Sequence, residues 1–114
     1  MKDRVVIIGV GCTKVGDLFE TSYDDMVLVA ANAAFDGAGI EAERIDAAWL
    51  GSFSPYGGHG KASVTLADAL RRYGKPTTRV ENFCATGTDA FRNAAMAVAS
   101  GMYDVACVLV RETA

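Results

Sequence analysis

Segments typical of strands and of helices alternate along the whole chain. Short apolar, β-branched runs predict strands at residues 4–10, 47–53, 78–83 and 104–111. Between them, helical patterns cover residues 26–35, 62–73 and 86–100. This βαβαβαβ order predicts the α/β class: a mostly parallel sheet with right-handed crossovers and helices on both faces.

The ends of the predicted helices carry local signals. The run from Ser22 to Asp25 resembles a capping box and predicts the start of the first helix, and Gly37 and Gly39 predict its end. Gly74 and Pro76 close the second helix. With 114 residues the chain is expected to form one domain at most.

The third predicted helix lacks a polar face in its second half. After Asn93 the sequence is apolar on every side up to Ala99, a pattern typical of a helix buried all round. It predicts a helix enclosed between two sheets. The four predicted strands form only one sheet, so the second sheet would have to come from elsewhere. The alternative is that alanine serves helix propensity alone. Because 51% of the residues are apolar, we expect a homo-oligomer, a second chain covering this surface, or both.

Charge and cysteine content exclude several classes of function. The net charge is −3 with scattered Lys and Arg, which argues against nucleic acid, and no run approaches the length of a membrane span. The three cysteines lack metal-type spacing, so we expect no metal site, no disulfide framework and a cytoplasmic location. The segment from Gly9 to Lys14 begins like a dinucleotide-binding fingerprint. Lys14 occupies the position of its third glycine, which argues against a dinucleotide site.

Cys84 stands where a predicted strand gives way to a helix. Unpaired amides and the helix dipole favour a thiolate at such a junction, which predicts a nucleophile for covalent catalysis. A buried apolar filler is an equally weighted alternative. For Cys107, inside an apolar run, and for Cys12, in a loop, the packing interpretation is favoured.

Other candidate residues are weaker. His59 is the only histidine, but it lies in a Gly-rich loop, so a surface position is favoured over a role as the base for Cys84. Arg71 and Arg72 could contact phosphates, although a solvated helix end is the simpler interpretation.

The residues around Cys84 resemble a known family. Residues 80–91, which include Asn82, Phe83 and Gly87, and the following run 94–105 are similar to the nucleophile region of thiolases. The sterol-carrier-protein type and the thiolase-like lipid-transfer proteins are particularly similar. Residues 5–11, 13–16 and 38–46 agree as well, so the resemblance covers the whole chain as the N-terminal portion of a thiolase.

The resemblance implies a site and a substrate. Cys84 would accept an acyl group from acyl-CoA as a thioester, for a Claisen condensation or the thiolytic cleavage of a 3-ketoacyl-CoA. Asn82 and Phe83 would shape the approach to Cys84, and Gly87 would let the helix lie close to the acyl group. The coenzyme A thioester is then the substrate and no bound cofactor is expected. The family's αβαβα architecture encloses the nucleophile helix between two sheets.

The resemblance also implies that some catalytic residues lie outside this chain. In thiolases the activating histidine and a second catalytic cysteine belong to the second half of the molecule, and His59 matches neither. Residues 1–114 are therefore expected to be the first part of an N-terminal thiolase domain, a fragment or subunit of a larger assembly, inactive without the C-terminal half. The alternatives are a β-ketoacyl synthase-like condensing enzyme, a non-catalytic lipid-carrier or partner subunit, and a cysteine hydrolase using His59.

Overall fold

The computed structural model describes residues 2–16, 20–52 and 64–111. Its three strands are parallel and lie in the order β2-β1-β3. They are β1 (Ala47–Ser52), β2 (Thr77–Val80) and β3 (Ala106–Arg111). The helices are α1 (Tyr23–Ala38), α2 (Val64–Ala69) and α3 (Thr86–Ala99), with a short 3-10 helix, η1 (Ala42–Arg44).

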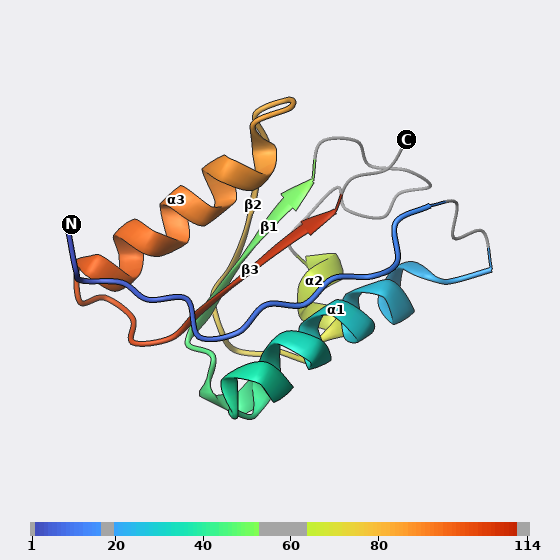
Figure 1. Ribbon diagram of the computed structural model, residues 1–114, viewed down its shortest axis with the longest axis horizontal. Coiled ribbons are helices and arrows are strands. Elements are labelled where there is room, and N and C mark those ends of the chain that lie inside the picture. Colours follow the sequence, from blue (N-terminus) through green and yellow to red (C-terminus); the bar gives the residue numbers. More distant parts are fainter. Residues whose placement is uncertain (1, 17–19, 53–63, 112–114) are drawn as a thin grey trace.

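The helices cover both faces of the sheet. Helix α3 lies on one face, and α1 and α2 lie on the other (Figure 1). The main apolar core fills the α1 and α2 side, where Leu50 is fully buried at the centre of the sheet. The α/β class and the parallel sheet with helices on both faces are therefore confirmed. The core residues are Tyr23, Val27, Ala31, Phe35, Ile45, Ala48, Leu50, Leu66, Ala69, Leu70 and Leu109.

The capping signals at both ends of α1 are confirmed. The Asp25 N–H donates to the Ser22 Oγ at 3.1 Å, which satisfies one of the free amides of the first turn. Gly39 ends the helix in the left-handed region at φ 69°, where its N–H reaches the Asp36 carbonyl oxygen. The helix runs to Ala38, so the predicted end at Phe35 was too early, and Gly37 lies inside α1 and does not end it.

The prediction of a buried first strand at residues 4–10 is wrong. Within the described residues this extended segment pairs with no strand, and Val6 and Val10 are 78% and 76% exposed. It runs alongside α1 (Figure 1). A Cβ on Gly9 would lie only 2.1 Å from the Ala34 carbonyl oxygen, so the glycine is there for contact with a helix and not with a phosphate. An apolar run becomes a strand only where a ladder partner exists.

Arg72 is a second correction, because it is buried and not part of a solvated helix end. Only 5% of it is exposed, and its Nη1 donates to the Ile45 carbonyl oxygen at 3.2 Å. Burial lowers the pKa of its guanidinium. Lys75 donates to the same carbonyl at 2.8 Å and to that of Glu43. These two cations therefore bind the chain just before β1.

Asp46 connects the starting points of β1 and β3. Its Oδ2 accepts the N–H groups of Asp104 and Val105, both at 2.9 Å. These two backbone hydrogen bonds lower the pKa of the carboxyl group. The side chain thus fixes where the β1–β3 ladder begins.

The pH dependence of stability tests this contact. Because the pKa of Asp46 is lower in the folded state, its stabilisation is complete above the usual carboxyl pKa of about 3.9 and disappears as pH falls through the folded value. Asp46→Asn should lower the free energy of unfolding at pH 7 and flatten its loss below about pH 4. Urea titrations measure this, with Asp36→Asn on α1 as the control. An equal acid response in both variants would contradict the assignment.

A pair of glycine substitutions tests the packing of residues 4–11 on α1. Gly9→Ala should destabilise the fold by about 1–3 kcal/mol, since the new methyl group overlaps the α1 backbone. Gly37→Ala adds the same methyl group to α1 in open space and should stabilise by up to about 1 kcal/mol. Denaturant midpoints compare the two. If both variants match the wild-type protein, the segment does not pack there in solution.

Candidate active site

Cys84 lies at the edge of the sheet where the parallel strands end. Strand β2 ends at Val80 and α3 begins at Thr86, so the turn 81–85 carries Cys84. Ser52 and Arg111 end β1 and β3 at the same edge, where they are paired in register. The carboxyl edge of a parallel sheet is where α/β proteins bind ligands.

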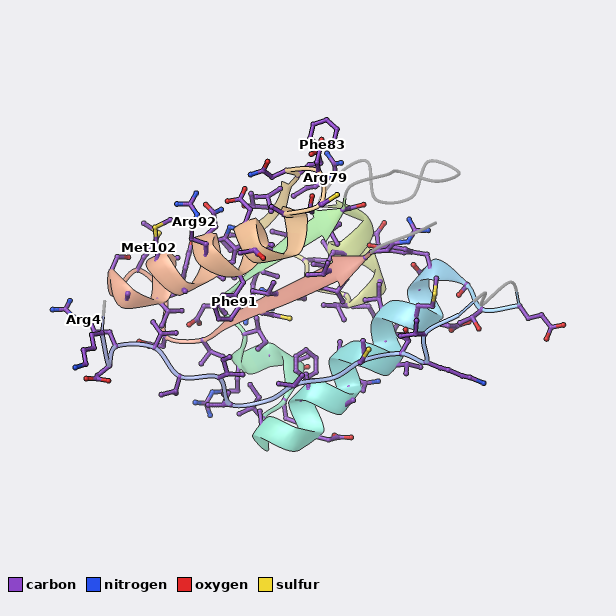
Figure 2. The ribbon with its side chains drawn as sticks, turned by 45° about the horizontal axis from the view of Figure 1, so that its top comes forward. Arg4, Arg79, Phe83, Phe91, Arg92 and Met102 are labelled. Carbon is purple, nitrogen blue, oxygen red and sulfur yellow. The ribbon has the colours of Figure 1, made fainter. Side chains whose placement is uncertain are left out.

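The turn before α3 has an unusual backbone conformation. Phe83, directly before Cys84, lies in the left-handed region at φ 46°. Such a conformation costs a non-glycine residue on the order of 1–3 kcal/mol and is typical of functional sites. Phe83 is 69% exposed and projects from the molecule (Figure 2). The structure therefore stores strain next to the candidate nucleophile.

Hydrogen bonds hold this turn from both sides. The Ala85 N–H donates to the Asn82 carbonyl oxygen at 2.9 Å, and the Phe83 N–H donates to the Glu81 carboxylate at 2.6 Å. The Thr86 hydroxyl contributes two further bonds, one to each side of the strained residue. Sequence reasoning missed Thr86, although a hydroxyl residue at a helix start is a known signal for such local bonds.

Two glycines bring the start of α3 close to the sheet. A Cβ on Gly51 would lie 3.2 Å from both the Thr86 carbonyl oxygen and its Cγ2. A Cβ on Gly87 would lie 3.2 Å from the two γ carbons of Val110. Gly87 thus faces β3 and serves helix-to-strand packing. Its expected closeness to an acyl group stays a prediction.

The three cysteines differ in accessibility. Cys84 and Cys12 are exposed, so Cys84 does not fill the core formed by the described residues, and the packing role expected for Cys12 is wrong. Cys107 lies on β3 and packs against the core, as expected, and burial raises the pKa of its thiol. Cys84 is therefore accessible to solvent in the described part of the chain. Its role as nucleophile, and the substrate-binding roles of Asn82 and Phe83, stay predictions.

A small cavity lies near the same edge of the sheet. Its volume is about 170 Å³, and Cys12, Met26 and Leu109 are among the residues that line it. The Arg111 guanidinium lies 4.9 Å from the centre of the Tyr23 ring, and both residues contribute to the wall. Sequence reasoning did not find this cavity, because it combines α1, β3 and the loop after residue 10.

Other expected features can be placed only in part. His59 lies outside the described residues. Across residues 2–16, 20–52 and 64–111, no three His, Cys, Asp or Glu side chains are grouped to hold a metal ion. In the same part of the chain, none of the helices combines the length and hydropathy that crossing a membrane requires.

Comparison with known proteins identifies the family. Residues 5–113 match the family description "Thiolase, N-terminal domain". The chain belongs to the thiolase family. This confirms the resemblance carried by the residues around Cys84.

Curated relatives extend well beyond the length of this thiolase-family chain. It is 39% identical over 107 residues to acetyl-CoA acetyltransferase of Methanothermobacter thermautotrophicus, a match that covers 92% of this chain and 28% of the relative. It is 33% identical over 111 residues to sterol carrier protein 2 of Gallus gallus, covering 96% of this chain and 20% of the relative. The chain thus spans between a fifth and three tenths of these proteins.

Solved structures share the fold. The Ltp2–ChsH2(DUF35) aldolase superimposes with a TM-score of 0.68 at 25% identity, over 89% of this chain and 26% of that chain. The priming β-ketosynthase of a polyketide biosynthetic pathway gives a TM-score of 0.60 at 26% identity, over 73% and 25%. Most of this chain therefore has the same fold as about a quarter of each of these longer chains.

Thiol labelling tests the difference between the cysteines. Iodoacetamide at pH 7 should modify Cys84 and Cys12 well before Cys107, because burial shields Cys107 and keeps its thiolate scarce until pH exceeds the usual value of about 8.5. Peptide mass spectrometry over time measures the order. In urea all three should react at similar rates. Equal labelling of Cys107 in the native protein would contradict its buried position.

Proposed function

We propose that this chain carries the acyl-accepting cysteine of a thiolase-family acyltransferase. The observation that supports it most directly is an exposed Cys84 on a strained turn at the start of α3, in a chain of this family. The similarity to an acetyl-CoA acetyltransferase suggests acyl-CoA as the substrate, in thiolytic cleavage of a 3-ketoacyl-CoA or in Claisen condensation.

The proposed acyl transfer is a thioester exchange. The Cys84 sulfur attacks the carbonyl carbon of acyl-CoA, a new C–S bond forms, and the bond to the coenzyme A sulfur breaks. Coenzyme A leaves with the proton that Cys84 gives up, and no oxidant or reductant is needed. Asn82 and Phe83 flank the thiol and would shape the approach of the substrate.

The remaining catalytic groups would come from outside residues 1–114. We expect a base and a second cysteine from the C-terminal half of a thiolase, in the same polypeptide or in a partner chain, since a nucleophile alone retains little rate. The exposed apolar side chains of α3 support this arrangement. Phe91 and Met96 on α3, and Met102 just after it, are exposed and could pack against a second sheet. We also propose an oligomer that acts in lipid metabolism in the cytoplasm.

A β-ketoacyl synthase-like condensing enzyme is a second candidate. It is favoured by the fold shared with the priming β-ketosynthase, at a TM-score of 0.60 and 26% identity. In both candidates Cys84 accepts the acyl group. They differ in whether a second catalytic cysteine takes part, which is a property of residues beyond this chain.

Mass spectrometry of the acyl-enzyme tests the proposal. After incubation of the purified assembly with acetyl-CoA, this chain should gain the mass of one acetyl group, which hydroxylamine removes. Cys84→Ala should abolish the adduct. Cys12→Ala, which removes the other exposed thiol, should retain it. An assembly that forms no adduct would favour a non-catalytic lipid-carrier or partner subunit.

A further inference from the structure

We infer that Thr86 is a positioning residue for the Cys84 thiol, acting through the backbone of residues 82 and 83 directly before it. This inference rests on the proposed function of Cys84. Residues 82–85 are all exposed, whereas Thr86, the first residue of α3, is only 1% exposed. The one buried side chain at this turn is therefore that of Thr86, which holds it together with the Ala85 N–H and the Glu81 carboxylate.

The Thr86 hydroxyl binds both ends of the strained segment. Its Oγ1 accepts the Asn82 N–H at 2.9 Å and donates to the Phe83 carbonyl oxygen at 2.6 Å. The Thr86 N–H donates to the same carbonyl at 3.2 Å. Two of the three bonds use the hydroxyl, which binds the N–H of the residue before Phe83 and the carbonyl of Phe83 itself. The left-handed conformation of Phe83, at φ 46°, thus depends on this side chain.

The other end of the Thr86 side chain is fixed by the sheet. Gly51 of β1 has no Cβ, and one placed there would come 3.2 Å from the Thr86 Cγ2. The methyl group therefore rests directly over the β1 backbone. A chain of contacts therefore connects the sheet to Cys84. It runs from Gly51 of β1 to the Thr86 side chain, and from there to the backbone of residues 82 and 83. A shift of the backbone at residues 82 and 83 therefore requires Thr86 to move or to lose its hydrogen bonds.

Removal of the Thr86 hydroxyl should shift the Cys84 thiol while the side chain at position 86 keeps its volume. Thr86→Val keeps the shape and the methyl contact but leaves the Asn82 N–H without this acceptor and the Phe83 carbonyl without this donor. Phe83 can then relax out of the left-handed region. Because a shift of about 1 Å can cost about a hundredfold in rate, we expect the limiting rate of Cys84 acetylation to fall about ten- to a hundredfold.

Two variants, compared with the wild-type protein at three cysteines, make the test specific. The rate of Cys84 acetylation is measured against acetyl-CoA concentration in the purified assembly for wild type, Thr86→Val and Thr86→Ser. Thr86→Val should lower the limiting rate with little change in the half-saturating concentration, and Thr86→Ser, which keeps the hydroxyl, should restore most of it. Iodoacetamide labelling of Cys12 and Cys107 should stay unchanged, since Cys107 lies on β3 and Cys12 in the loop after residue 10.

The outcomes separate this inference from the proposed function. If the wild-type protein forms no acetyl adduct, the proposed function fails, and Thr86 is judged by whether Thr86→Val changes the iodoacetamide rate of Cys84 while Thr86→Ser does not. Equal rates at Cys84 in all three proteins would overturn the inference, as would a loss accompanied by faster Cys107 labelling, which reports general unfolding. If Thr86→Val does not fold, Thr86→Ala, a better helix former, replaces it.

Discussion

The close approach of α3 to the sheet is the constraint on which the candidate site depends. Gly51 leaves room for Thr86 on one side, and Gly87 leaves room for Val110 on the other. Ala90, one turn along, is fully buried over the same strands. Small residues at successive turns let the helix backbone lie almost on the strands, and dense packing then leaves the first turn little freedom. The position of the preceding turn, which carries Cys84, is fixed as a result.

Much of this arrangement could be predicted from local sequence. Ser22 and Gly39 mark the ends of α1 through hydrogen bonds within a few residues of each other, so no knowledge of the fold is needed. The place of Cys84 follows from the order of elements alone, because a residue between a parallel strand and the next helix must lie at the carboxyl edge of the sheet.

Other features depend on partners far apart in the sequence and could not be predicted. Arg72 is polar and follows a helix, yet the carbonyl it binds belongs to Ile45, which lies 27 residues earlier. The segment 4–10 has the composition of a strand, but composition alone does not determine whether a neighbouring strand is available to pair with it. The role of Thr86 needs both the local turn and the contact with Gly51, of which only the first is visible in sequence.

Two exposed apolar regions have a common physical cause. Val6 and Val10 in the N-terminal segment, and Phe91 and Met96 on α3, are large apolar side chains left in water. A sheet of three strands has only two faces, and here α3 covers one while α1 and α2 cover the other. The segment beside α1 and the outer side of α3 then have no described layer against them. In a protein of the thiolase family, whose relatives are more than three times as long, such surfaces are where further layers of the same fold can pack.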